Sequence, residues 1–80
     1  METASVEVRL VEIMRETFND PALVLRDDLT AADVNGWDSL SHIDLIVAVE
    51  SEFGIRLTTG EVRKLRNVGD FVKVIAGKAR

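Results

Sequence analysis

Apolar residues between positions 39 and 53 recur at intervals of three and four, which is the spacing of an α-helix. On a helical wheel, at about 100° per residue, they form two groups rather than one. The first group is an ordinary core-facing stripe: Leu45, Ile46, Val49 and Phe53. The second group lies roughly opposite: Leu40, Ile43 and Val47. This pattern predicts a helix with one face in a bundle core and a second face that has no partner in so short a chain.

The N-terminal segment also has helical spacing. Its stripe consists of Val6, Leu10, Ile13, Met14 and Phe18. Residues 6–10 also alternate as a strand does, which leaves the first turn open. Pro21 marks the end of this helix.

A long connection follows at residues 19–37. It holds apolar residues that we expect to anchor it: Leu23, Val24, Leu25, Leu29, Val34 and Trp37. Thr30 and Asp33 have the spacing of a capping box and predict a short helical turn within it. A connection of this length is usually functional or packed on the core.

Two further capping signals divide the rest of the chain. Thr58 and Glu61 form a capping box that opens a short helix holding Val62 and Leu65. Asn67 caps a last helix with a stripe at i, i+3, i+4 and i+7: Val68, Phe71, Val72 and Ile75. The sequence therefore predicts an all-α fold, a small four-helix bundle of three main helices and one short helix with a long loop between the first two. Its 80 residues predict a single domain, residues 1–80.

The second helix is predicted to begin at Ser39, with Asp38 as its N-cap, and to end at Gly54. A helix start leaves backbone N–H groups without intrahelical partners and carries about half a positive charge. We therefore expect a phosphate group bound to the Ser39 hydroxyl to be stabilised there. The Asp-Ser-Leu tripeptide alone is more often a plain helix cap without chemistry.

Charge is segregated along the chain. Residues 27–52 carry seven acidic residues and no Lys or Arg, whereas residues 53–80 carry two acidic and seven basic residues. A negative field around Ser39 disfavours nucleic acid as a partner and favours proteins with basic patches. The chain has no Cys, which excludes a thiol nucleophile and a thiolate metal site and fits a reducing cytoplasm. No apolar run approaches the roughly 18 residues that a membrane span needs, so no membrane association is expected.

Several short motifs occur together. They are Asp38-Ser39-Leu40 about halfway along, Leu45-Ile46 with Glu50 and Glu52 downstream, Phe53-Gly54-Ile55, and Asn67-Val68-Gly69-Asp70-Phe71. With this length and the lack of Cys, the chain from about Val6 to Ala76 resembles the acyl carrier proteins, of the small stand-alone type that serves fatty-acid or polyketide-like pathways.

The resemblance implies a non-catalytic carrier with a covalent cofactor. A separate phosphopantetheinyl transferase would attach a 4′-phosphopantetheine arm from coenzyme A to the hydroxyl of Ser39, and Asp38 would help that enzyme engage the site. The Mg²⁺ of the reaction would belong to the transferase, and no metal is expected on this chain. The arm's thiol would carry an acyl group as a thioester. Four residues are candidates for lining an acyl pocket between the helices: Leu45, Val49, Leu65 and Phe71.

A docking face is predicted beside Ser39. It consists of the outward stripe and two carboxylates that we expect to be exposed: Leu40, Ile43, Asp44, Val47 and Glu50. Such a face suits transient contact with acyl-loading and acyl-processing enzymes that present basic patches. We expect the carrier to be a monomer.

Two departures from the family pattern bear on the pathway. Ser41 stands where many members have an acidic residue, and Arg63, Lys64 and Arg66 make the short helix basic where an acidic one is common. These departures favour a specialised pathway. Peptidyl carriers usually have Gly-Gly before the modified serine pair, and Gly36-Trp37 differs, although an aminoacyl cargo stays open.

Two other hypotheses compete. Ser39 and His42, at i and i+3, are close enough for a catalytic pair, but the surrounding residues do not form a G-x-S-x-G elbow. His42 is the only histidine, which excludes a multi-histidine metal site and favours a packing role, and Trp37 is predicted to anchor the loop. The stronger alternative is a helical adaptor that uses the outward stripe and is never modified.

Overall fold

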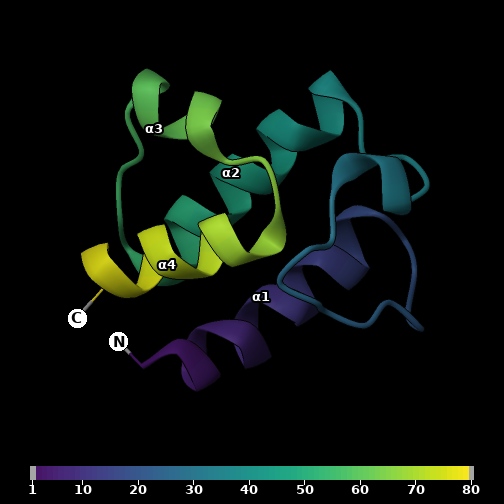
Figure 1. The fold of residues 1–80 in the computed structure, drawn as a ribbon, viewed down its shortest axis with the longest axis horizontal. Coiled ribbons are helices and arrows are strands. Elements are labelled where there is room, and N and C mark those ends of the chain that lie inside the picture. Colours follow the sequence, from purple (N-terminus) through teal and green to yellow (C-terminus); the bar gives the residue numbers. More distant parts are fainter. Residues whose placement is uncertain (1, 80) are drawn as a thin grey trace.

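The computed structural model describes residues 2–79, which form four α-helices and one short 3-10 helix (Figure 1). They are α1 (Thr3–Thr17), η1 (Ala31–Asp33), α2 (Ser39–Phe53), α3 (Thr59–Lys64) and α4 (Val68–Lys78). No strand occurs within the described residues. The prediction of an all-α fold with three main helices, one short helix and a long connection is confirmed.

Helix α1 begins at Thr3, so the segment that also alternates like a strand is helical from its first turn. Helical spacing prevails because it places Val6, Leu10 and Met14 on one face, where they are fully buried. The helix ends at Thr17, and Asn19 adopts a left-handed conformation with φ of 52° before Pro21.

The connection between α1 and α2 is fastened to the start of α4. The backbone N–H groups of Val68 and Gly69 donate to the carbonyl oxygens of Leu29 and Asp27, each over 2.9 Å. A Cβ on Gly69 would lie 3.1 Å from the Asp27 oxygen, so glycine permits this close approach. The predicted capping box of Thr30 and Asp33 forms and opens η1.

Most of the predicted anchors of this connection lie in the core, namely Leu23, Leu29, Val34 and Trp37. The prediction is wrong for Val24, which is 69% exposed. Its neighbour Leu23 is buried and Leu25 is partly buried against the core, while the Val24 side chain faces solvent.

Helices α2, α3 and α4 have the predicted caps. Gly54 ends α2 in a left-handed conformation with φ of 64°, and Thr58 forms a capping box with Glu61 at the start of α3. The Asn67 side chain accepts a hydrogen bond from the Asp70 N–H over 2.9 Å. Helix α3 buries none of its own residues, and Leu65, predicted within it, is instead the buried residue that follows its last turn.

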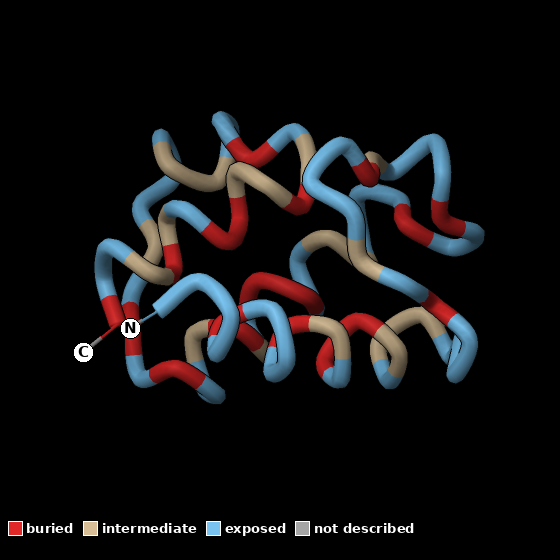
Figure 2. Tube along the Cα trace, turned by 60° about the horizontal axis from the view of Figure 1, so that its bottom comes forward, coloured by how far each residue is buried: buried red, intermediate tan, exposed pale blue. Residues whose placement is uncertain are grey.

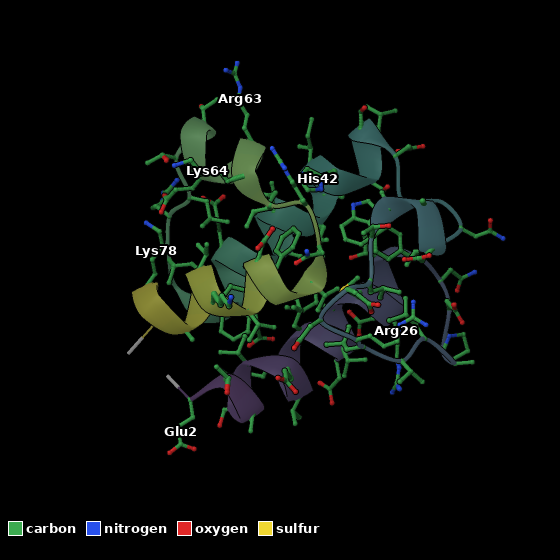
Figure 3. All side chains as sticks on the ribbon, in the orientation of Figure 1. Glu2, Arg26, His42, Arg63, Lys64 and Lys78 are labelled. Carbon is green, nitrogen blue, oxygen red and sulfur yellow. The ribbon has the colours of Figure 1, made fainter. Side chains whose placement is uncertain are left out.

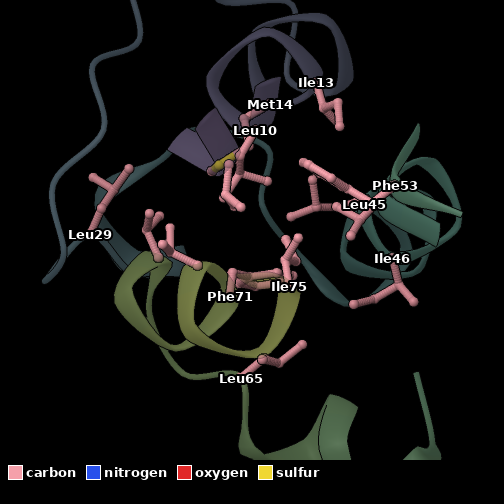
Figure 4. Packing of buried hydrophobic residues seen from close by; sticks show 14 of the residues in the cluster. Leu10, Ile13, Met14, Leu29, Leu45, Ile46, Phe53, Leu65, Phe71 and Ile75 are labelled. Carbon is pink, nitrogen blue, oxygen red and sulfur yellow. The ribbon is translucent and has the colours of Figure 1, made fainter. Parts of the chain in front are cut away.

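The buried side chains meet between α1, α2 and α4, since α1 packs on both other long helices (Figures 2 and 4). Figure 4 shows Leu10 and Met14 of α1 facing Phe71 and Ile75 of α4, with Leu45 of α2 beside them. In the described part of the chain, no helix combines the length and apolar character that a membrane span requires.

Candidate functional site

Ser39 is the first residue of α2 and its side chain is exposed to solvent. Asp38 precedes it as the N-cap, and its Oδ1 accepts hydrogen bonds from the N–H groups of Leu40 and Ser41, each over 3.0 Å. Both predictions for this helix start, the cap and the position of the serine, are confirmed. No hydrogen bond from any residue of 2–79 engages the Ser39 hydroxyl, which is therefore free to react.

Ser41 forms the second half of the capping box, because its side chain binds the backbone of Asp38. Its Oγ accepts a hydrogen bond of 2.8 Å from the N–H of Asp38 and donates to the carbonyl oxygen of Gly36. Hydrogen bonds from the backbone N–H and the hydroxyl of Ser41 hold the pKa of Asp38 below its ordinary value. The serine that departs from the family pattern thus fixes the turn from which Ser39 projects.

The N-cap engages two of the backbone amides at this helix start. The N–H groups of Leu40 and Ser41 are already bound by the Asp38 carboxylate. The helix start therefore presents an exposed hydroxyl on a capped turn, and the stabilisation of a phosphate on Ser39 stays a prediction.

Trp37 and His42 form one aromatic unit behind the serine. The indole N–H of Trp37 donates to Nδ1 of His42 over 3.1 Å, and the two rings lie nearly parallel, with an interplanar angle of 16°. The Trp37 ring also packs on Phe18 and Phe71 with centroid distances of 5.5 and 6.1 Å. The predictions of Trp37 as a loop anchor and of His42 as a packing residue are confirmed.

His42 is unsuited to act as a base on Ser39. Its Nδ1 accepts from Trp37, so the neutral ring carries its proton on Nε2. No hydrogen bond joins the two side chains in the described residues. Burial lowers the pKa of His42, which keeps the ring neutral and able to accept the indole N–H.

The outward stripe of α2 is exposed as predicted, with Leu40 at 76%, Ile43 at 60% and Val47 at 58% of full exposure. Asp44 is exposed beside it. The prediction that Glu50 is also exposed is wrong. Its side chain is half-buried because Oε2 accepts a hydrogen bond of 2.9 Å from the backbone N–H of Leu57, in the loop before α3.

Three basic residues lie on or just after α3: Arg63, Lys64 and Arg66. All three are exposed, and within residues 2–79 none forms an ion pair. The one ion pair that α3 contributes in this range joins Glu61 to Lys78 of α4 over 3.0 Å. In Figure 3 the Arg63 side chain points away from the body of the molecule.

The four acyl-pocket candidates occupy the common core. Leu45 and Val49 are fully buried on α2, Phe71 is 1% exposed on α4, and Leu65 is buried after α3 (Figure 4). They come from three different parts of the chain and face one interior.

One feature of the site was not predicted. A hollow of about 420 Å³ lies beside Ser39 and is lined by Ala31, Trp37, Asp38, Ser39 and His42. The capping box at Thr30 predicted a helical turn, but nothing in the pattern indicated that this turn would come to lie beside the start of α2.

The hydrogen bond from the Leu57 N–H to the Glu50 carboxylate was also not predicted. Its donor is a backbone group, which leaves no mark in the sequence.

A family model described as the phosphopantetheine attachment site matches residues 8–75. The chain is 37% identical over 67 residues to an acyl carrier protein of Acidothermus cellulolyticus, an alignment that covers 84% of this chain and 80% of that protein. It is 32% identical over 74 residues to an acyl carrier protein of Rickettsia typhi, covering 91% of this chain and 85% of the relative.

Solved structures agree with these relatives. The solution NMR structure of a holo acyl carrier protein from Geobacter metallireducens matches with a TM-score of 0.86 at 40% identity, over 90% of this chain and 83% of that one. The crystal structure of an acyl carrier protein from Thermotoga maritima matches with a TM-score of 0.82 at 29% identity, over 98% and 91% of the two chains. With a free serine hydroxyl at a helix start and relatives matched over most of its length, the chain belongs to the acyl carrier proteins, non-catalytic carriers with a covalently bound phosphopantetheine group.

Proposed function

We propose that Oγ of Ser39 is the attachment point of the phosphopantetheine arm. The hydroxyl oxygen attacks the phosphorus that bears the pantetheine half of coenzyme A, and a phosphodiester bond forms. The bond to the adenosine 3′,5′-bisphosphate half breaks, that half leaves, and the hydroxyl proton passes to a base of the transferase. The Mg²⁺ and the catalysis belong to that separate enzyme.

The observation that carries this proposal is the exposed Ser39 hydroxyl, held in place by the caps of Asp38 and Ser41. The residues around it fit the cofactor because the hydroxyl has open access from solvent. When bound, the arm supplies a thiol for thioester chemistry. The chain has no Cys, so this thiol has no competitor on the protein.

The outward stripe, with Asp44 beside it, supports a docking role for this face of α2. Exposed apolar side chains next to a carboxylate suit a partner that offers an apolar surface with a basic rim. In this proposal, acyl-loading and acyl-processing enzymes bind there and bring their active sites to the arm. Glu50 is assigned a structural part, since its carboxylate holds the loop before α3.

The exposed basic residues of α3 support a specialised fatty-acid or polyketide-like pathway rather than a general one. A housekeeping enzyme whose basic patch reaches α3 would be repelled by Arg63 and Lys64. The relatives described above are acyl carrier proteins, so an aminoacyl cargo and an unmodified adaptor are the less favoured alternatives.

The acyl chain is proposed to enter the core between the helices, against the four candidates named above. Support comes from their common position in one apolar interior. We also propose that residues 1–80 act as one carrier domain, as a monomer in the cytoplasm, in keeping with the absence of Cys from the chain.

The attachment is tested by incubating the purified protein with coenzyme A, Mg²⁺ and a broad-specificity phosphopantetheinyl transferase, followed by intact-mass measurement. The wild type is expected to gain one phosphopantetheinyl unit. Ser39→Ala is expected to gain none, while Ser51→Ala, which changes another exposed serine of α2, is modified as the wild type is. Modification of Ser39→Ala, or no modification of the wild type while a known carrier is modified, would overturn the proposal.

A further inference from the structure

The hollow beside Ser39 has the position and lining of a seat for a small group. Its volume of about 420 Å³ falls within the range of small-molecule sites, about 300–1,000 Å³. It is lined by Ala31 of η1 and by Trp37, Asp38, Ser39 and His42 around the start of α2.

The aromatic side of the hollow is held in place before anything binds. Trp37 is only 7% exposed, and its ring packs on Phe18 and Phe71. The hydrogen bond from its indole N–H to His42 fixes the second ring against the first. The edge of His42 in turn meets the Phe71 ring with a centroid distance of 5.8 Å. A preformed surface of this kind binds a group without the entropic cost of ordering side chains.

The chemistry of the lining selects an uncharged apolar group. The lining includes an indole ring, an imidazole ring kept neutral by burial, and the methyl group of Ala31. Asp38 at the rim is ionised and repels anions. The Leu40 and Ser41 amides are occupied by that same carboxylate.

We infer that this hollow seats the first apolar part of the phosphopantetheine arm, the carbon that carries two methyl groups next to the phosphate. The inference rests on the proposed attachment to Ser39 and adds a binding site to it. The dimethyl carbon follows the phosphodiester by only a few bonds, so it can reach Trp37, His42 and Ala31 while the phosphate stays in solvent.

A weak contact suffices here because the arm is tethered. A group linked through a short flexible connection has an effective concentration on the order of millimolar at its site. The seat therefore holds the base of the arm beside η1, while the thiol end continues into solvent toward partner enzymes.

The test uses the full chain in apo and holo forms, with the protein labelled in ¹³C and ¹⁵N and the arm added unlabelled from coenzyme A. Intact mass first verifies that the arm is present. Isotope-filtered NOE spectra are expected to connect the two arm methyl groups to ring protons of Trp37 and His42. The indole N–H resonance of Trp37, the only tryptophan, is expected to shift between apo and holo forms.

A matched pair of variants distinguishes direct binding of the arm in the hollow from an indirect change of the Trp37 indole resonance. Ala31 and Ala32 are both exposed in η1, but only Ala31 lines the hollow. Ala31→Glu places a charged side chain in the hollow and is expected to remove at least half of the apo-to-holo indole shift, together with the methyl contacts. Ala32→Glu is expected to retain both.

The outcomes distinguish the two proposals. If the mass shows the arm but no methyl contact appears, and the indole shift is the same in both Ala variants, the seat is overturned and the attachment stands. If no arm is added to the wild type, the attachment fails and the seat fails with it.

Discussion

The Glu50 carboxylate and the Leu57 backbone N–H are joined by a hydrogen bond of 2.9 Å that ties the last turn of α2 to the loop before α3. Asp44, also acidic and on the same helix, is exposed. Replacement of Glu50 therefore tests stability, whereas replacement of Asp44 tests docking.

We expect Glu50→Lys to lower the free energy of unfolding by about 1.5–3 kcal/mol, because it removes a charged acceptor from a half-buried amide. Asp44→Lys should change it by no more than about 0.5 kcal/mol. Urea denaturation measures both. Equal stability of the two variants would show that the Glu50 bond contributes nothing.

Asp44→Lys is also expected to slow acyl loading by a partner enzyme at low salt, and the deficit should shrink as salt is added, because surface charges are screened. The rate is measured by the appearance of acylated protein over time. A loading rate equal to that of the wild type at low salt would remove Asp44 from the docking face.

Asp38→Ala should destabilise the protein, since the N-cap of α2 is lost, whereas Asp38→Asn should retain most of the stability. The folded-state pKa of Asp38 is lowered, so its contribution is present above the ordinary value of 3.8 and is lost as pH falls through the folded-state pKa. Unfolding experiments from pH 6 downward compare the variants. Asp38→Asn that unfolds as readily as Asp38→Ala would contradict the cap.

His42 is expected to make stability depend on pH at higher pH values than Asp38 does. Its folded-state pKa is lowered by burial, so the neutral ring stabilises the protein above the ordinary value of 6.5, and this stability declines as pH falls below it. Protonation of Nδ1 also breaks the bond from Trp37. Proton NMR of the single histidine should give a pKa below 6.5, and His42→Gln should flatten the dependence of stability on pH below 6.5. A measured pKa of 6.5 or higher contradicts this.

The α3 charges give a direct test of the specialised pathway. The double variant Arg63→Glu with Lys64→Glu should be loaded faster than the wild type by a general fatty-acid enzyme with a basic patch, most clearly at low salt. Loading by the carrier's own partner should not improve. The matched control is Lys73→Glu, an exposed basic residue on α4. An unchanged rate for the double variant with the general enzyme argues against exclusion by charge.

A core substitution tests where the acyl chain goes. Leu45→Ala and Leu10→Ala each remove a fully buried leucine side chain and should cost about 2–5 kcal/mol in the holo form. A medium-length acyl chain that enters beside Leu45 fills the cavity there. Acylation should then recover stability in Leu45→Ala and not in Leu10→Ala, as measured by thermal unfolding; equal recovery in both would remove Leu45 from the pocket.

Local signals in the sequence predicted most of the fold. The caps at Asp38, Thr58 and Asn67 and the stop at Gly54 were found because each depends on residues within one turn. The exposed stripe of α2 was found because helical periodicity alone separates its two faces.

The errors lie where distant segments meet. Val24 is apolar, as an anchor residue should be, but its exposure depends on how the connection folds in three dimensions. In the sequence, Glu50 cannot be told from an exposed carboxylate, because its hydrogen bond depends on the position of the Leu57 backbone in the folded chain. The hollow beside Ser39 needs η1 to come next to α2, and no local pattern encodes that approach.

The backbone hydrogen bonds from Val68 and Gly69 to Leu29 and Asp27 hold the chain segment that leads to Ser39 against α4. With the arm on Ser39, as proposed, every partner enzyme meets the same stationary base, whatever cargo is loaded. The reach of the thiol from this attachment point is then set chiefly by the rotatable bonds of the prosthetic group.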